Sequence, residues 1–320
     1  MTSCGRFGRF RLVIFLLASV IALYFYQHKG NNSTKVKIPD RLKKLQLTEQ
    51  EQIRRKNHIN KLCNEFGYNI SISNITSTLL DHLIVDDEHK LIYCYVPKVA
   101  CTNWKRILLA LQNGNKKNLL TISGNETHSY EFLTLQMFSK EEILKRLNEY
   151  LKFVFVRHPY ERLLSAYRNK FEKIYSTYFW NRFGRKIIKR YRQNPEKTSL
   201  DKGHDVTFQE FLNYVGDLDR TNNRIAFNEH WRPMFDLCFP CSIKYDIIGK
   251  YRTLEDDADY TLWQAGLTEM VFPQRDASYR FQRSSDLMST YYRNISQETI
   301  EKLKQIYKND FALFEYNDFI

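Results

Sequence analysis

Two segments of the chain place cationic and hydroxyl side chains where a strand pattern gives way to a helix pattern. The first spans residues 97–103 and contains Lys98 and Thr102. A turn that leads into a helix N-terminus offers unpaired backbone N–H groups and a partial positive charge, which suit a phosphate-like group. The segment lacks the glycines of the GxxxxGKS/T pattern, so it does not predict an ATP-binding P-loop. An ordinary strand–helix connection with a surface lysine is the alternative interpretation.

The second segment, residues 157–165, repeats this arrangement. Arg157 ends an apolar run, and Ser165 lies eight residues later, within the predicted helix. An arginine can donate two parallel hydrogen bonds to a phosphate, and a serine can add a third. Arg157 could instead pair with Glu161, and His158 fits a structural role better than a catalytic one. Two such turns side by side predict a pocket for a nucleotide with two phosphate clusters, and therefore a group-transfer enzyme.

The elements around these segments alternate between strand and helix patterns. Such alternation predicts an α/β fold, with a mainly parallel central sheet and helices on both faces. Ligands of such sheets bind beyond the carboxyl ends of the strands, which is where both segments fall. We expect strands at residues 83–85, 91–96, 152–156 and 245–251, and helices at 103–111, 160–171 and 253–266, the last with Thr253 as its N-cap.

The composition describes a folded and strongly basic protein. The 320 residues are 43% hydrophobic and 15% aromatic, which excludes an intrinsically disordered chain. The formal net charge of +13 favours an acidic partner, which could be nucleic acid, anionic lipid or an acidic polysaccharide. Charge alone does not choose among these three.

The N-terminus favours a membrane anchor with the rest of the chain in the lumen. An uncharged apolar run at residues 12–26 follows three arginines, and the basic flank predicts a cytoplasmic N-terminus. A cleaved signal peptide is the alternative, although residues 24–29 form a poor cleavage context. Six N-x-S/T sequons agree with a luminal, glycosylated chain and argue against nucleic acid: Asn31, Asn32, Asn69, Asn74, Asn125 and Asn294.

We therefore expect four regions. These are a cytoplasmic tail at residues 1–11, a transmembrane signal anchor at 12–27, a polar luminal stem at 28–62 and one globular domain at 63–320. The absence of a proline or glycine cluster after residue 63 favours a single domain.

The chain has six cysteines, of which Cys4 lies in the predicted cytoplasmic tail. The other five are predicted to be luminal, so at least one is unpaired or links two chains. Cys238 and Cys241 have the spacing of a zinc knuckle or a redox pair, but no second CxxC completes a zinc site. We expect either a structural disulfide between them or a different partner for each.

The motifs resemble those of a known family. YVPKVACTNWK at 95–105 and VRHPYERLLSAYRNKF at 156–171 resemble the two cofactor-binding motifs of Golgi carbohydrate sulfotransferases, in the group of chondroitin/dermatan 4-O-sulfotransferases and HNK-1 sulfotransferases. Further matches follow in order at residues 184–192, 227–231, 237–241 and 245–257. The resemblance implies a P-loop-like sulfotransferase fold, a Golgi membrane location and the cofactor 3′-phosphoadenosine 5′-phosphosulfate (PAPS), with no metal.

The resemblance also implies roles for the two segments. Lys98 would stabilise charge on the leaving phosphate, whereas a kinase would need paired carboxylates for magnesium. His158 stands where some relatives carry an acid, so we do not expect it to be essential. The 5′-phosphosulfate would be held by Pro97, Lys98, Val99, Ala100, Cys101, Thr102 and Asn103. The 3′-phosphate would be held by Arg157, His158, Pro159, Tyr160, Glu161, Arg162, Leu163, Leu164 and Ser165.

A base must deprotonate the acceptor hydroxyl, and the hypothesis is that His230 is this base because it stands in the 227–231 motif. Glu229, His128 and His204 are the alternatives, and His230 could also be a structural histidine beside Trp231.

The acceptor would bind to a basic segment at residues 170–192, in which aromatic residues are interleaved. A solvated helix face is the alternative interpretation. The glycan-binding candidates are Lys186, Lys189, Arg190 and Arg192.

The predicted reaction is sulfation of a glycan hydroxyl, with position 4 of N-acetylgalactosamine in chondroitin as the preferred acceptor. Dermatan, terminal N-acetylgalactosamine and the 3-hydroxyl of glucuronic acid are alternatives within the family. A non-catalytic luminal glycan-binding protein is the alternative of another class.

Overall fold

A computed structural model describes most of the chain. The predicted anchor at residues 12–27 and the sequons at Asn31, Asn32, Asn69 and Asn74 lie outside the described residues. Among the residues that are described, no helix has both the length and the apolar character needed to cross a membrane. The described ranges are 39–68, 76–114, 119–173, 177–217, 227–274 and 282–318.

A central sheet of four strands organises the described residues, in the order β1–β2–β3–β4. β1 pairs antiparallel with β2, whereas β2–β3 and β3–β4 are parallel, so the sheet is mainly parallel as predicted. Nearly every strand residue is buried, as expected for short apolar strands covered on both faces. The strands are β1 Leu83–Asp86, β2 Leu91–Cys94, β3 Leu151–Val156 and β4 Ile247–Lys250.

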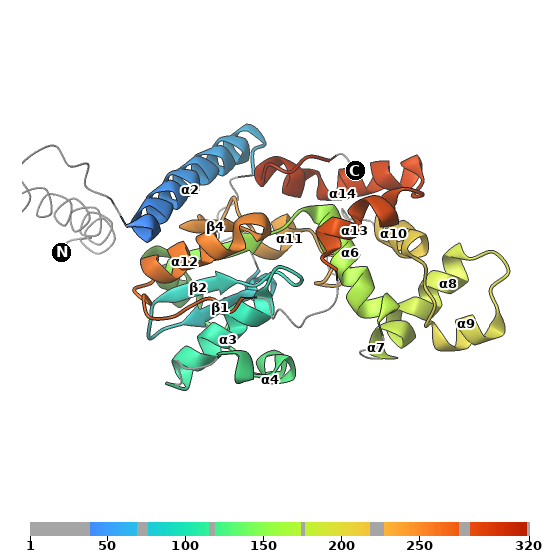
Figure 1. The fold of residues 1–320 in the computed structure, drawn as a ribbon, viewed down its shortest axis with the longest axis horizontal. Coiled ribbons are helices and arrows are strands. Elements are labelled where there is room, and N and C mark those ends of the chain that lie inside the picture. Colours follow the sequence, from blue (N-terminus) through green and yellow to red (C-terminus); the bar gives the residue numbers. More distant parts are fainter. Residues whose placement is uncertain are drawn as a thin grey trace, which may run out of the picture.

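Helices cover both faces of this sheet (Figure 1). On one face α3 (Cys101–Gln112) packs Trp104 against Phe153 and Phe155 of β3, with ring centroids 4.8 and 5.0 Å apart. Gly249 of β4 makes room for this cluster, because a Cβ there would lie 2.2 Å from the Phe155 ring. The opposite face is covered by α2 (Asp40–Glu65) and α12 (Leu254–Gln264).

Helix α2 is the main difference from the expected organisation. The sequence predicts a polar stem up to residue 62, but α2 lies against β4 and α12. Its Arg55 forms a buried ion pair with Asp257 of α12, at 2.9 Å, and also donates to the main-chain oxygen of Ile248 in β4. A disulfide joins Cys63 of α2 to Cys241. These contacts make α2 part of the packed fold rather than a free spacer.

Most of the remaining helices form a second hydrophobic cluster beside the sheet, centred on Phe211 and Trp231, whereas the helices Lys140–Glu149 and Met234–Cys238 pack into the cluster around the sheet itself. The helix predicted at 160–171 ends at Tyr167 and continues as a π-helical turn, Arg168–Glu172; a second such turn is Trp180–Gly184. The other described helices are α4 Gly124–Ser129, α5 Lys140–Glu149, α6 Pro159–Tyr167, α7 Thr177–Phe179, α8 Arg185–Tyr191, α9 Lys197–Lys202, α10 Phe208–Gly216, α11 Met234–Cys238, α13 Ser284–Tyr292 and α14 Gln297–Leu313.

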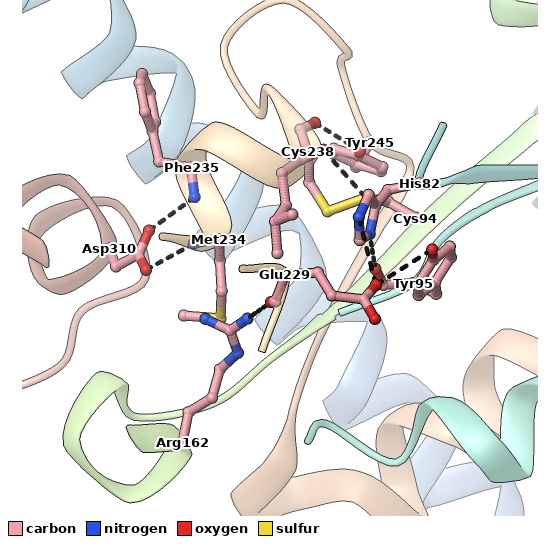
Figure 2. The surroundings of a disulfide bond; sticks show 11 residues. His82, Cys94, Tyr95, Arg162, Glu229, Met234, Phe235, Cys238, Tyr245 and Asp310 are labelled. Carbon is pink, nitrogen blue, oxygen red and sulfur yellow. Dashed lines mark hydrogen bonds and ion pairs between the residues drawn. A yellow bond between two sulfur atoms is a disulfide. The ribbon is translucent and has the colours of Figure 1, made fainter. Parts of the chain in front are cut away.

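The disulfides follow the second of the two predicted possibilities. Cys238 and Cys241 each pair with a distant cysteine, giving Cys94–Cys238 and Cys63–Cys241. Cys101 is buried and free, which confirms that one cysteine of the predicted luminal set stays unpaired within the chain. The Cys94–Cys238 bond ties the end of β2 to the end of α11 (Figure 2).

Candidate active site

The turn after β2 has an unusual backbone. Lys98 and Ala100 both adopt the left-handed conformation, with φ of 72° and 56°. This conformation costs a non-glycine residue roughly 1–2 kcal/mol, so the surrounding structure must hold the turn in place. Helix α3 begins directly afterwards at Cys101, and the first amides of a helix have no acceptor within it. The turn therefore presents Lys98 and the amide end of a helix together, without the glycines of a P-loop.

Arg157 links this turn to the second one. Its Nη1 donates to the main-chain oxygen of Lys98 at 3.0 Å, and its guanidinium lies 4.2 Å from the Tyr251 ring centre. Its Nε also donates to Glu161 at 3.1 Å, so the ion pair considered as an alternative is present. The two predicted phosphate-binding segments are thus neighbours, as the sequence predicts.

Arg162 fastens the same turn to a third segment. Its fully buried guanidinium donates to three main-chain oxygens: Pro97 at 3.0 Å, Arg232 at 2.6 Å and Glu229 at 2.6 Å. Figure 2 shows Arg162 reaching toward the chain at Glu229. The contacts give Arg162 a positioning role, whereas the family resemblance implies contact with the cofactor.

Several other candidates in the second segment serve the fold. His158 accepts a hydrogen bond from the Tyr160 amide through Nδ1 and caps α6, and its Nε2 donates to the Asn317 carbonyl at 2.9 Å. Burial lowers the pKa of His158. These contacts support the structural interpretation of this histidine. The side chains of Pro159, Tyr160, Leu163 and Leu164 are buried, whereas that of Ser165 is half-buried.

The residues of the first segment also differ in what their side chains do. Val99 and Cys101 are buried, so they would offer their backbone to a ligand. The side-chain Nδ2 of Asn103 already donates a hydrogen bond to the Pro273 carbonyl, at 2.9 Å. The Thr102 hydroxyl lies 3.1 Å from Nε2 of His128, at the end of α4. His128 is therefore close to the turn although it is distant from it in sequence.

Positive charge gathers at this point. The pKa of Lys98 is lowered to about 8, chiefly by burial and in addition by the nearby Lys170, Arg157 and Lys173. Burial likewise lowers the pKa of Lys170, whose ammonium lies 4.5 Å from the Phe179 ring centre. Such groups gain most when an anion replaces the water they have lost.

His230 and Glu229 lie at the edge of this cationic cluster. The Nδ1 atom of His230 lies 2.7 Å from the Asn228 Oδ1 atom. Burial lowers the pKa of His230 well below its usual value, and Lys170 and Lys98 add to the effect. The carboxylate of Glu229 accepts a hydrogen bond from the Tyr95 hydroxyl at 3.4 Å.

A pocket of about 290 Å³ opens beside Glu229. Its wall contains His82, whose ring stacks on Tyr95 and whose Nε2 lies 3.7 Å from the Glu229 carboxylate (Figure 2). Sequence reasoning missed both His82 and Tyr95 as site residues. The available signal for Tyr95 was its position at the end of a core strand, whereas His82 had none.

Comparison with known proteins identifies the family behind this arrangement. Residues 81–317, which include both turns and the pocket, match the model of the sulfotransferase family. The chain belongs to that family. This confirms the family predicted from the motifs.

The sulfotransferase is similar to several curated proteins. It is 47% identical over 247 residues to carbohydrate sulfotransferase 11 of Mus musculus, covering 76% of this chain and 69% of that protein. It is 43% identical over 240 residues to carbohydrate sulfotransferase 14 of Danio rerio, covering 75% of this chain and 63% of that protein. It is 37% identical over 284 residues to carbohydrate sulfotransferase 9 of Homo sapiens, covering 85% and 61%. No solved structure matches.

The basic segment of the sulfotransferase is only partly available to a ligand. Arg192 pairs with Glu210 at 2.7 Å and with Asp205 at 2.6 Å, and Arg190 lies 3.4 Å from Asp217. Four other cations of this segment are exposed: Arg182, Arg185, Lys186 and Lys189. Arg182 also lines the pocket, so the exposed cations lead toward Glu229.

Among the described residues, neither His204 nor a metal-binding group of side chains belongs to the site. His204 lies beside Asp205 and Trp180 in the described helical part, away from both turns. Over the residues that the structure describes, no group of three or more His, Cys, Asp or Glu side chains could hold a metal ion.

Proposed function

We propose that this sulfotransferase transfers sulfate from PAPS to a carbohydrate hydroxyl, specifically position 4 of N-acetylgalactosamine in chondroitin. The observation that carries the proposal is the hydrogen bond between Arg157 and the Lys98 carbonyl, because it brings two cationic turns together. The relatives named above as carbohydrate sulfotransferases support a glycan acceptor. The motif resemblance described above supports the chondroitin 4-position.

The described residues fit the donor. The left-handed turn at Lys98 and Ala100 leaves the α3 amides and the Lys98 ammonium for a 5′-phosphosulfate, and Arg157 and Ser165 would hold the 3′-phosphate. Bound PAPS would supply the sulfuryl group and a phosphate leaving group. Lys98 would stabilise the charge that grows on the phosphate oxygen as the sulfur leaves it.

The acceptor class is supported by charge. The net charge of +13 and the exposed Arg185, Lys186 and Lys189 favour a polyanion over a neutral terminal sugar. Binding through these residues should weaken as salt rises. Dermatan, terminal N-acetylgalactosamine and the glucuronic acid 3-hydroxyl remain the alternative acceptors.

We also propose a Golgi membrane location with a luminal catalytic domain. Support comes from the apolar run at residues 12–26 and from two disulfides, which persist in oxidising compartments. The sequons at Asn125 and Asn294 are exposed, so both could carry a glycan. Glycosidase treatment of the protein expressed through the secretory pathway, followed by gel electrophoresis, would test the luminal location: a mobility shift is expected.

The experiment that tests the function is incubation of the full-length protein with radiolabelled PAPS and a panel of chondroitin, desulfated dermatan and heparan acceptors. Disaccharide analysis then identifies the sulfated position. We expect Lys98→Gln to lower turnover by about 10²–10³-fold, since it removes a donor to the developing charge. Lys61→Gln, at an exposed position of α2, is the matched control. A protein that binds chondroitin but neither adenosine 3′,5′-bisphosphate nor PAPS would instead be a glycan-binding protein.

A further inference from the structure

We propose that the acceptor sugar binds in the pocket beside Tyr95 and that Glu229 takes the proton from its hydroxyl. This inference rests on the proposed function and extends it to a binding site and a catalytic base. The pocket has a volume of about 290 Å³ and is lined by Tyr95, Glu229, Arg182, Arg232, Phe183 and Phe227, among others. That volume suits a sugar ring rather than a flat surface contact.

The Glu229 carboxylate is fixed and accessible at once. Its main-chain oxygen is held by Arg162 at 2.6 Å, and its side chain accepts from the Tyr95 hydroxyl at 3.4 Å. About a third of the side chain is exposed, at 36%. Because Arg162 also holds the Pro97 oxygen, the same buried guanidinium sets the position of Glu229 relative to the donor turn. A base needs this combination of fixed geometry and access to the substrate.

His82 supports the protonated form of this carboxyl group. Its Nδ1 lies 2.9 Å from the Tyr95 carbonyl oxygen, which can only accept, so Nδ1 carries the hydrogen. Burial lowers the pKa of His82 and keeps the ring neutral. Its Nε2 is then a free acceptor 3.7 Å from the Glu229 carboxylate, and it can receive a hydrogen bond once that group has taken a proton.

His230 is poorly arranged for the same task. The Asn228 side-chain oxygen accepts from Nδ1 of His230, which leaves Nε2 as its single basic atom. The partly buried ring lies among Lys170, Lys98 and Arg162, so an added proton would place one more cation among cations. A carboxylate at that edge becomes neutral when it takes a proton, so no new ion has to be buried.

The pocket also offers matching groups for an acidic glycan. Phe183 and Phe227 supply apolar faces for a sugar ring, and Arg182 and Arg232 supply charge for a neighbouring carboxylate or sulfate. Among the described residues, the buried Nε of Arg232 has no hydrogen-bond partner, so it is a donor still to be satisfied.

The acceptor hydroxyl oxygen forms a bond to sulfur while its proton moves to a Glu229 carboxylate oxygen. The bond between sulfur and the 5′-phosphate oxygen breaks, and its electron pair stays on that oxygen, which is released in adenosine 3′,5′-bisphosphate. Lys98 stabilises this oxygen, and Glu229 later releases the proton to solvent.

The test compares Glu229→Gln with the wild type in the full-length protein. We expect turnover to fall by about 10²–10⁴-fold. The affinity for adenosine 3′,5′-bisphosphate, measured by calorimetry, should stay within about twofold, which also shows that the variant folds. Glu131→Gln, at an exposed position, is the matched control.

A second variant, Tyr95→Phe, keeps the ring but removes a hydrogen bond to the carboxylate. We expect it to lower turnover while the affinity for adenosine 3′,5′-bisphosphate is kept, because the carboxylate loses a donor that orients it. A purely structural role for Tyr95 would instead lower the unfolding temperature and the bisphosphate affinity together. The charged and titratable groups that surround Glu229 are Asp81, His82, Tyr95, Lys105, His128, Arg162, Lys170, Arg182, His230 and Arg232.

Three results would overturn the assignment. Glu229→Gln could keep its turnover while His230→Asn loses it, which would make His230 the base. Glu229→Gln could raise only the KM for the acceptor, which would make Glu229 a binding residue. A wild type that binds adenosine 3′,5′-bisphosphate yet transfers sulfate to none of the acceptors would remove the proposed function itself, and the base with it.

Discussion

Substitution of Arg162 by lysine tests whether one buried guanidinium assembles the site. Arg162 donates to the main-chain oxygens of Pro97, Glu229 and Arg232, and its side chain is fully buried. A lysine keeps the positive charge, but its single nitrogen cannot reach all three oxygens. At least one hydrogen bond to a charged group is lost, and each contributes about 1.5–3 kcal/mol.

The expected result has two parts. The midpoint of thermal unfolding should fall by about 3–12 °C, because 1 kcal/mol corresponds to roughly 2–4 °C in a domain of about 150–250 residues. Turnover should fall by about 10- to 100-fold, since misplacement of a catalytic segment by about 1 Å can cost 10²-fold. The affinity for adenosine 3′,5′-bisphosphate should change by less than about threefold, because Arg157 and Lys98 remain.

Calorimetric titration, thermal unfolding and sulfate transfer on the same preparation separate the two possible roles. Arg41→Lys is the control, because Arg41 is 54% exposed and its pair with Asp259 lies at the surface. Suppose that Arg162→Lys leaves the unfolding midpoint unchanged and abolishes bisphosphate binding. Arg162 would then contact the donor directly, as the family motif implies, and the positioning argument would be refuted.

Three further predictions follow from single groups. Because an anion favours the ammonium form and the pKa of Lys98 is about 8, affinity for adenosine 3′,5′-bisphosphate should fall as pH rises from 7 to 9.5, and Lys98→Gln should flatten this dependence in calorimetry. Burial raises the pKa of Asp310 to about 6, so the protonated form stabilises the fold, fully below about pH 4. This contribution, on the order of 2–3 kcal/mol, is lost as pH rises through 6. Denaturant titrations at several pH values should show that the free energy of unfolding of Asp310→Asn lacks this loss. Arg55→Met leaves the buried Asp257 without its cation and should lower the free energy of unfolding by about 3–5 kcal/mol, whereas Arg54→Met, at a half-exposed pair, should change it by at most about 1 kcal/mol.

The sequence predicts the sheet and the two turns well because their signals are local. The strands are short continuous apolar runs. β4 (247–250) lies within the predicted 245–251, and β3 (151–156) begins one residue before the predicted 152–156. Arg157 and Lys98 meet because parallel neighbouring strands end at the same sheet edge.

Contacts between polar residues that are distant in the sequence could not be predicted from the sequence. Helix α2 is rich in charged residues and was predicted to be a stem, yet its buried set includes Gln52 and Arg55, which a hydrophobicity pattern assigns to the surface. Their partner Asp257 lies about 200 residues away. The cluster of His82, Tyr95 and Glu229 depends in the same way on the fold bringing three segments together.

The Cys94–Cys238 bond bears on how this protein loses activity. Cys94 ends the strand before the donor turn, and Cys238 ends the helix that follows the segment carrying Glu229. One disulfide therefore connects the two halves of the site covalently (Figure 2). Thermal fraying of either half cannot carry it far from the other. The protein expressed in a reducing cytosol would lack this disulfide. Its site would then lose its arrangement at temperatures at which the sheet is still folded.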